Sequence, residues 1–229
     1  GIIGLNNGND YVCSGSWGWS SELPQADFTG TVRWQDLWGF ATAQIMSEVS
    51  PAMHDEFVLQ YEAPLMAQFG LNTYGCCEPL HRKLDLLKRR IPRLRRVSIS
   101  PWADKALSAE QLGDQIIFNW KPNPAVLAGV ELDEEWARAD IRETVDICRA
   151  NACPLDIVMK DTHTCQHQPW RFDRWAQIAR EEEGDDLEDP LAVPRVDVAD
   201  VAELPVELGA DAGLLVRLAH GRLRPALAG

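Results

Sequence analysis

The chain has 229 residues and a formal net charge of −13, from 22 basic and 35 acidic residues. Hydrophobic residues make up 45% of it and charged residues 25%, which is typical of a soluble globular protein. No stretch of about 18 uncharged apolar residues occurs, which excludes a membrane span. A general nucleic-acid binder needs a basic face, so the acidic balance argues against that class as well.

The excess of acid is concentrated at the end of the chain. Residues 181–229 hold 12 acids and 4 arginines, a balance of −8, so residues 1–180 carry only −5 of the total of −13. No basic segment with an apolar core follows Gly1, so we expect no signal peptide. Because the first residue is not Met, we also expect a chain that lacks its natural beginning. Without a secretion signal, the six cysteines are predicted to be reduced thiols of a cytoplasmic protein.

The first part of the chain divides into a loop and a helix. Residues 1–40 are rich in Gly, Asn, Ser and Trp, which indicates a long loop packed over another part of the molecule. Ser50 followed by Pro51 is typical of a helix start. Apolar residues then recur every four positions, at Phe57, Tyr61, Leu65 and Phe69, and predict one face of a helix that ends at Gly70.

Strands and helices alternate in the rest of the first 183 residues. Strands are predicted at Leu71–Gly75, Arg96–Ser100, Gln115–Trp120 and Leu155–Met159. Helices are predicted at Pro79–Ile91, Ala103–Leu112, Asp133–Ala150 and Pro169–Glu183. This alternation, with short loops, indicates parallel βα units of an α/β protein. Because no Gly-rich dinucleotide fingerprint or phosphate loop follows a strand, we favour a TIM-type (β/α) barrel, or the C-terminal part of one.

Residues 184–229 differ in composition from the part before them, because they contain no Lys, no aromatic residue and no Cys. Two interpretations stay open. One is a linker followed by a C-terminal helix near Ala210–Leu218, and the other is a segment from an altered reading frame, unrelated to the ancestral domain. We therefore divide the chain into a partial barrel at 1–183 and an acidic, low-aromatic tail of undefined structure at 184–229.

Residues whose side chains can take part in binding or catalysis follow each predicted strand directly. The C-terminal ends of parallel barrel strands share one face, so these residues are expected to converge there. They are Cys76, Cys77 and Glu78, then Trp102 and Asp104, then Lys121 and Asn123, and finally Lys160, Asp161, His163 and Cys165.

Four of these residues are of the types that zinc prefers, namely Cys76, Cys77, His163 and Cys165. A catalytic zinc takes three protein ligands and keeps one open position, where it can hold a substrate thiol as the thiolate. The spacing is not that of a zinc finger. The alternative is that Cys77 and Cys165 are small buried hydrophobic residues.

The charged residues after the last two strands also have two interpretations each. Lys121 in WKPNP either binds a carboxylate or polarises a carbonyl, or it is a solvated lysine of a turn. The pair Lys160-Asp161 directly follows a buried strand, and its alternative role is that of an ion pair at the barrel rim.

Several segments resemble the uroporphyrinogen decarboxylase superfamily, and in particular its bacterial uroporphyrinogen-decarboxylase-like branch. They are SPAMHDEFVLQYEAPLMAQFGLNTYGCCEPL, RRVSISPWADKALSAEQLG, KPNPA and KDTHTCQHQPWRFDRWAQIAR, in a resemblance that runs from about Leu23 to Arg180. The resemblance implies a (β/α)8 barrel with its site at the C-terminal strand face. The superfamily contains tetrapyrrole decarboxylases without metal or cofactor, and corrinoid-dependent methyltransferases whose zinc is held by a His-x-Cys pair and a later Cys.

The resemblance implies specific roles in this chain. Tyr74-Gly75-Cys76 falls at the His-x-Cys pair, with Tyr74 in place of the His, and Cys165 is the candidate for the later Cys. Cys77 or His163 is the candidate for the missing ligand. The Arg-rich loop and N-terminal Asp of the decarboxylases have no counterpart here, and about four to five strands stand where a full barrel has eight. The chain is thus either a fragment or a half-barrel that pairs with another chain.

These observations lead to one predicted function and two alternatives. We expect zinc-assisted methyl transfer from a corrinoid or small methyl donor to a thiol, with Lys160, Asp161 and Lys121 positioning the donor. The residues expected to bind substrate are Tyr74, Glu78, Trp102, Asp104 and Asn123. The alternatives are metal-free decarboxylation of a uroporphyrinogen-type tetrapyrrole, and a non-catalytic fragment. The predicted partners are a small-molecule or tetrapyrrole substrate, a corrinoid protein and a second copy of the chain.

Overall fold

The computed structural model describes residues 4–8, 10–13, 15–184 and 214–218, and their centre is a mixed sheet. Its strand order is β3-β4-β5-β6-β7-β8. The strands are β3 (Trp38–Ala41), β4 (Leu71–Tyr74), β5 (Leu94–Ile99), β6 (Ile117–Trp120), β7 (Leu155–Met159) and β8 (Leu214–Leu218). Each strand from β3 to β6 pairs in parallel with the next one along the chain, whereas β8 is antiparallel to β7. The predicted parallel α/β architecture is confirmed.

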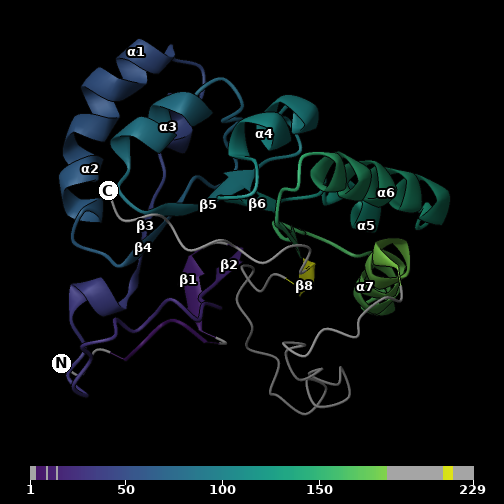
Figure 1. Cartoon of the computed structure of the whole chain (residues 1–229). Coiled ribbons are helices and arrows are strands. Elements are labelled where there is room, and N and C mark those ends of the chain that lie inside the picture. Colours follow the sequence, from purple (N-terminus) through teal and green to yellow (C-terminus); the bar gives the residue numbers. More distant parts are fainter. Residues whose placement is uncertain (1–3, 9, 14, 185–213, 219–229) are drawn as a thin grey trace.

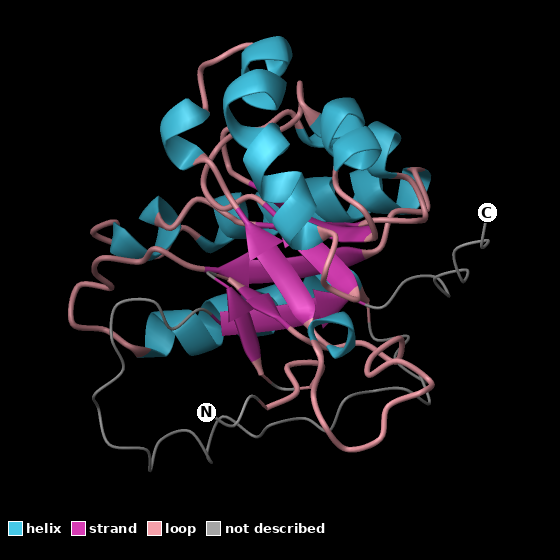
Figure 2. Ribbon diagram, turned by 90° about the vertical axis from the view of Figure 1, so that its left-hand side faces the viewer, coloured by secondary structure: helices cyan, strands magenta, loops and turns pink. Residues whose placement is uncertain are grey.

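Six helices lie between the parallel strands, and a seventh, α7, follows the last of them in the described part of the chain. They are α1 (Pro51–His54), α2 (Gln60–Met66), α3 (Leu84–Arg90), α4 (Lys105–Leu112), α5 (Ala125–Ala128), α6 (Glu134–Ala150) and α7 (Trp170–Glu183). Figure 1 shows most of them as an arc along one side of the sheet, and Figure 2 shows the twisted strands from a second direction. In the described part of the chain, none of these helices combines the length and apolar character that crossing a bilayer requires.

Side-chain caps explain where three of the helices begin. The hydroxyl of Ser50 accepts from the backbone N–H of Met53 at the start of α1, and the carboxylate of Asp133 accepts from Trp136 at the start of α6. These caps satisfy backbone N–H groups that have no partner within the helix, and both starts are as predicted. Asp104, which we expected to bind substrate, caps α4 in the same way by accepting from the N–H of Leu107.

The two faces of the sheet differ in chemistry. One face is apolar and packs into the main core under the helices, through Val97, Ile99, Phe118, Trp120, Ile157 and Met159. The alternate residues of the same strands are buried and polar, and they are Arg96, Ser98, Asn119 and Asp156. A small antiparallel hairpin, β1 (Tyr11–Cys13) and β2 (Ser16–Trp17), lies on the polar side, below the sheet in Figure 1. Since side chains alternate along a strand, successive residues of each strand contribute in turn to the apolar face and to the polar face.

The helical segment after Ser50 has its apolar stripe outside. Phe57, Tyr61 and Leu65 are 52%, 66% and 62% exposed, although their spacing of four is typical of a buried face. A π-helical turn at Asp55–Leu59 joins α1 to α2. A π turn contains one residue more than an α turn, so it rotates the following residues about the helix axis. The buried residues of the segment are instead His54, Val58, Leu59 and Met66.

Two predictions made from local pattern are corrected. Residues 1–40 are not only a loop, because they contain β1, β2 and the start of β3, at Trp38. The helix expected near Ala210–Leu218 is wrong where the structure describes that segment, since Leu214–Leu218 is strand β8 and all five of its residues pair with β7. Its sequence, LLVRL, is too short to show a helical period, and the edge of β7 offers it a complete set of hydrogen bonds. Residues 210–213 lie outside the described residues.

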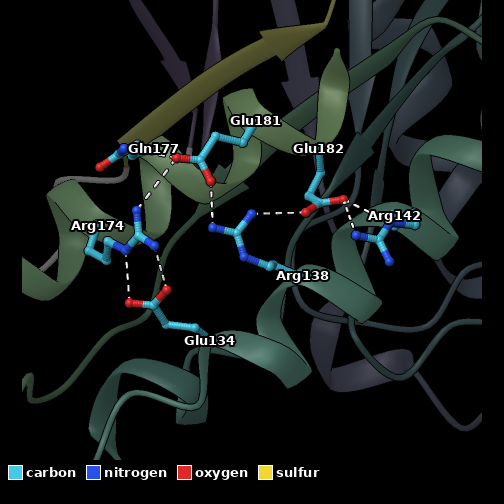
Figure 3. Close-up of polar contacts among 7 residues, drawn as sticks. All are labelled: Glu134, Arg138, Arg142, Arg174, Gln177, Glu181 and Glu182. Atoms are coloured by element: carbon cyan, nitrogen blue, oxygen red, sulfur yellow. Dashed lines mark hydrogen bonds and ion pairs between the residues drawn. The ribbon is translucent and has the colours of Figure 1, made fainter.

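Charged side chains connect the last two helices on their outer side. Glu134 of α6 accepts two hydrogen bonds from Arg174 of α7, at 2.8 and 2.5 Å. Arg138 donates to Glu181 and Glu182, and Figure 3 shows that these groups alternate in sign across the two helices. This network links α7 to α6 through partly exposed ion pairs, beside the buried contacts of the two helices in the core.

Candidate functional site

Four side chains meet at the C-terminal ends of β4 and β7, and we call them the thiol cluster: Cys76, Cys77, Lys160 and Asp161. The ammonium Nζ of Lys160 lies 2.9 Å from Sγ of Cys76 and 3.3 Å from Sγ of Cys77. The thiol of Cys77 donates to Oδ2 of Asp161 at 3.1 Å, and this carboxylate also pairs with Lys160 at 3.0 Å. Residues 84 positions apart thus converge as we predicted from the parallel strand order.

The protonation states within the thiol cluster follow from its contacts. Burial alone would lower the pKa of Lys160, but its hydrogen bonds to Cys76 and Asp161 outweigh burial and raise that pKa. Burial would raise the pKa of Asp161, but the bonds from Cys77 and Lys160 outweigh it and the pKa is lowered. The contact with Cys76, burial and the nearby carboxylate raise the pKa of Cys77. At neutral pH the cluster therefore holds an ammonium, a carboxylate and, at Cys77, a thiol.

The loop after β4 is held in place by Glu78, which is 2% exposed. One carboxylate oxygen accepts from the hydroxyl of Thr42 at 2.8 Å and from the N–H of Ala43 at 3.2 Å. The other accepts from the N–H of Cys76 at 2.9 Å. The hydroxyl of Ser98 donates to the carbonyl of Cys76 from the next strand. Glu78, predicted to bind substrate, therefore fixes the backbone that carries the first thiol.

Asp161 has a backbone conformation that residues with side chains adopt infrequently. Its φ is 56°, in the left-handed region. Such a conformation costs free energy and persists where the surrounding contacts determine it, commonly at functional sites. Here it turns the carboxylate toward Cys77 and Lys160, both of which it contacts.

Lys121 lies beneath the thiol cluster, and the β1–β2 hairpin covers it. Its ammonium donates to the carbonyl of Gly15 and to the side-chain oxygen of Asn119. The hydroxyl of Ser16 donates to the same amide oxygen at 3.0 Å. Burial, together with repulsion from Lys160 and Arg96, lowers the pKa of Lys121 to about 7. It is thus neither a solvated turn lysine nor a group at the rim.

A buried ion pair under the hairpin was not predicted from the sequence. Nε of Arg96 on β5 lies 3.0 Å from a carboxylate oxygen of Asp156 on β7. The same guanidinium donates to the carbonyl of Trp17 and lies 4.7 Å from the centre of the Trp38 ring. The signal was one charged residue of opposite sign in each of two short strand segments, RVSIS and LDIVM. Arg96 thus joins Lys121 and Lys160 on the face under the hairpin, where Asp156 pairs with Arg96 and Asp161 pairs with Lys160.

Tyr74 lies on the other face of β4, away from the thiol cluster. Its hydroxyl contacts Nε2 of His54 at 2.8 Å and donates to Oε2 of Glu62 at 2.8 Å. Nζ of Lys83 lies 3.5 Å from Nδ1 of His54. Burial, and next the charge of Lys83, lower the pKa of His54 to about 4, so the imidazole is neutral. A chain of hydrogen bonds therefore runs from Lys83 through His54 and Tyr74 to Glu62, between the sheet and the first helices. We call it the donor series from Lys83 to Glu62.

The other predicted substrate-binding residues are at the rim but separate from the thiol cluster. The side chain of Asn123 accepts from the N–H of Ala125, as part of a turn. The Trp102 ring is 68% exposed and follows β5, so it remains available to a ligand at this end of the sheet. Asp104 is the cap of α4 described above.

The predicted zinc ligands are not brought together as a set. The loop that carries His163 and Cys165 runs along the surface, with an exposed His163 and a partly buried Cys165. In the residues that the structure describes, no group of three or more His, Cys, Asp or Glu is arranged to hold a metal ion. The ammonium of Lys160 already contacts the two sulfurs that would bind first. This donor set does not fit the catalytic zinc that the resemblance implies.

Comparisons with protein-family models, with curated proteins and with solved structures found no match to this chain. The resemblance to the uroporphyrinogen decarboxylase superfamily stays a prediction from the motifs quoted above.

Proposed function

We propose that the chain is part of a (β/α) barrel enzyme of the uroporphyrinogen decarboxylase type, and that its thiol cluster accepts a methyl group from a small donor or a corrinoid. The order of the parallel strands supports the first part. In a barrel of this type each strand pairs with its successor in the chain, and the site lies at the C-terminal strand ends. Strands β3 to β7 have that order, and the thiol cluster lies at that end.

The contact between Lys160 and Cys76 carries the second part of the proposal. An ammonium 2.9 Å from a sulfur favours the thiolate over the thiol, and the thiolate is the nucleophilic form of cysteine. Cys77 is held as a thiol by Asp161, so Cys76 is the nucleophile of the pair. In this mechanism the lysine supplies the positive charge that the metal supplies in the mechanism predicted from the sequence.

The step is a displacement at the methyl carbon. A lone pair of the Cys76 thiolate forms the new S–C bond while the bond from the methyl group to its carrier breaks, and that electron pair leaves with the carrier. The negative charge passes from sulfur to the carrier, and Lys160 next to Cys76 holds the sulfur as the thiolate at the start of the step. Asp161 keeps Lys160 oriented through their 3.0 Å ion pair.

The test is methylation of the whole chain, first by methylcobalamin and then by methyl tosylate as a small donor. We expect peptide mass spectrometry to find one added methyl group on Cys76. The Cys76→Ser variant should lose it, and the Cys148→Ser variant is the matched control, because Cys148 is buried in the core under the helices. Replacing Lys160 by Met should slow the reaction about tenfold, since a hydrogen bond to a charged group is lost, and Lys160→Arg should retain most of the rate. Equal methylation of Cys76 and Cys165 would contradict the proposal.

One observation favours the metal-free decarboxylase alternative. Arg96, Lys121 and Lys160 are all buried on the same side of the sheet, under the hairpin, where carboxylate side arms of a tetrapyrrole would need cations. Binding of uroporphyrin, measured by fluorescence in the presence of a chelator, separates the two proposals. Binding that weakens in Lys121→Met but not in Cys76→Ser would support the decarboxylase, and no binding together with no methylation would leave a non-catalytic fragment.

A further inference from the structure

The two sulfurs of the thiol cluster are close but differ in their surroundings. Sγ of Cys76 lies 3.6 Å from Sγ of Cys77. Cys76 is 5% exposed, and its sulfur accepts a hydrogen bond from the ammonium of Lys160. Cys77 is partly exposed, and its thiol donates a hydrogen bond to the carboxylate of Asp161. A thiolate beside a cation reacts with oxidants, and a neighbouring thiol with a base at hand can attack the product. Cys76 is placed for the reaction with the oxidant, and Cys77 with Asp161 is placed for the attack on its product.

We propose that Cys76 is an oxidation site for hydrogen peroxide and that Cys77 resolves the product to a disulfide between these adjacent residues. This inference concerns the site of the proposed function and rests on the same assignment of Cys76 as the thiolate. In the first step, the Cys76 thiolate attacks one oxygen of the peroxide, the O–O bond breaks, and hydroxide leaves with the electron pair. The product is the sulfenic acid of Cys76, in which sulfur has lost two electrons to the peroxide.

In the second step, Cys77 attacks the sulfenic sulfur of Cys76. Asp161, whose Oδ2 lies 3.1 Å from Sγ of Cys77, accepts the thiol proton. The S–S bond forms, the S–O bond breaks, and the departing hydroxide takes up a proton to leave as water. Lys160, which contacts both sulfurs, is the nearest donor for that proton and regains it from solvent. In total, two thiols and one peroxide give a disulfide and two waters.

The disulfide between these residues is predicted to be easily reversed. A trans peptide joins them, so their Cα atoms are about 3.8 Å apart. Most protein disulfides span about 4.4–6.8 Å between Cα atoms, and strained disulfides are reduced more easily. Oxidation would thus block the nucleophile of the thiol cluster and protect Cys76 from further oxidation until a dithiol restores it.

The experiment uses the full chain, fully reduced and then treated with hydrogen peroxide at stepwise excess. We expect two of the six thiols to disappear, and the mass of the peptide with Cys76 and Cys77 to fall by two hydrogens. Dithiothreitol should restore both thiols. In Cys77→Ser, dimedone should instead trap a sulfenic acid on Cys76. In Lys160→Met, loss of thiols should be about tenfold slower than in Lys160→Arg, because only the arginine keeps the charge.

The chain contains an internal control, because Cys148 and Cys153 form a second close pair that is buried at 2% exposure each. Cys148→Ser should leave the peroxide reaction unchanged. A disulfide that forms between Cys148 and Cys153, or a Cys76 oxidised to the sulfinic acid while Cys77 keeps its thiol, would overturn the inference. A chain that forms the predicted disulfide but accepts no methyl group refutes only the proposed function. A chain methylated at Cys76 whose peroxide treatment never links the two sulfurs refutes only this inference.

Discussion

Gly15 lies directly against Lys121. Its carbonyl oxygen accepts a hydrogen bond from the lysine ammonium, and a Cβ atom added at Gly15 would lie 2.8 Å from that Nζ and 2.8 Å from Cδ of Lys160. The turn of the β1–β2 hairpin therefore rests on the two lysines of the candidate site, and a side chain at Gly15 would have to displace one or both of them.

Replacing Gly15 by Ala should loosen the hairpin. Its φ of +67° disfavours a side chain, and the added methyl group would push on both lysines. Gly113, with φ +55° and open space around its position, is the matched control, because Gly113→Ala has the backbone strain without the contact. We expect denaturant unfolding to show a loss for Gly15→Ala that exceeds the control by about 1–3 kcal/mol, the usual cost of overpacking. Equal losses of stability in the two variants would mean that Gly15 of the hairpin does not pack against the lysines.

The buried Lys121 should make stability depend on pH in the alkaline range. Its pKa in the fold is about 7, below the ordinary 10.5, so the unfolded chain binds more protons between these values. Stability contributed by this group therefore increases as pH rises from about 7 toward 10.5, and is lowest below pH 7. Urea unfolding at a series of pH values checks this. The wild type should gain stability relative to Lys121→Met across that window, and parallel curves would contradict the burial of the ammonium.

His54 should remain neutral well below its ordinary range. We expect an NMR titration to give a pKa near 4, because burial and the charge of Lys83 both oppose a second proton. Since the pKa in the fold is below the value of 6.5 for an exposed histidine, stability from this group is lost as pH falls from about 6.5 toward 4. Replacing Lys83 by Met removes the repulsion but not the burial, so the pKa of His54 should rise while staying below 6.5. A His54 that titrates near 6.5 in the wild type would show that the donor series from Lys83 to Glu62 is not formed.

Glu78 should be needed for both stability and the placement of Cys76. In Glu78→Gln, one of the two oxygens becomes an NH₂ group that faces a backbone N–H or the hydroxyl of Thr42. Leaving such a buried donor unsatisfied costs about 1–3 kcal/mol. Glu110→Gln on the exposed side of α4 is the control and should change stability by no more than about 0.5 kcal/mol. Iodoacetamide labelling of Cys76 should slow in Glu78→Gln only, and an unchanged rate would argue against a positioning role.

The convergence of Cys76, Cys77, Lys160 and Asp161 could be predicted from the sequence. Each pair closely follows a short buried strand, and parallel strands bring their C-terminal ends to one edge. The place of Tyr74 also follows from alternation, because it occupies a position of β4 whose side chain faces the helices, like Asn72 with its bonds to Met66 and Pro92. The resemblance, which placed Tyr74 at a ligand position, concealed that simpler argument.

Other features could not be predicted from local pattern. The path of the loop with His163 and Cys165 depends on two residues in left-handed conformations, Gln166 and His167, with φ of 57° and 58°. No short motif encodes such a path. The cover over Lys121 depends on a contact between Gly15 and a residue 106 positions away, which neither segment reveals alone. The π turn after His54 likewise leaves exposed the apolar residues whose regular spacing predicts a buried helix face.

Strand β8 has a consequence for any larger assembly. It occupies the outer hydrogen-bonding edge of β7 along all five of its residues, in the opposite direction to the other strands. A further parallel strand, from this chain or another, would need the same backbone donors and acceptors. Completion of a cylinder at that edge and retention of β8 therefore compete for one set of partners, so an incoming strand could join there only by exchange with β8.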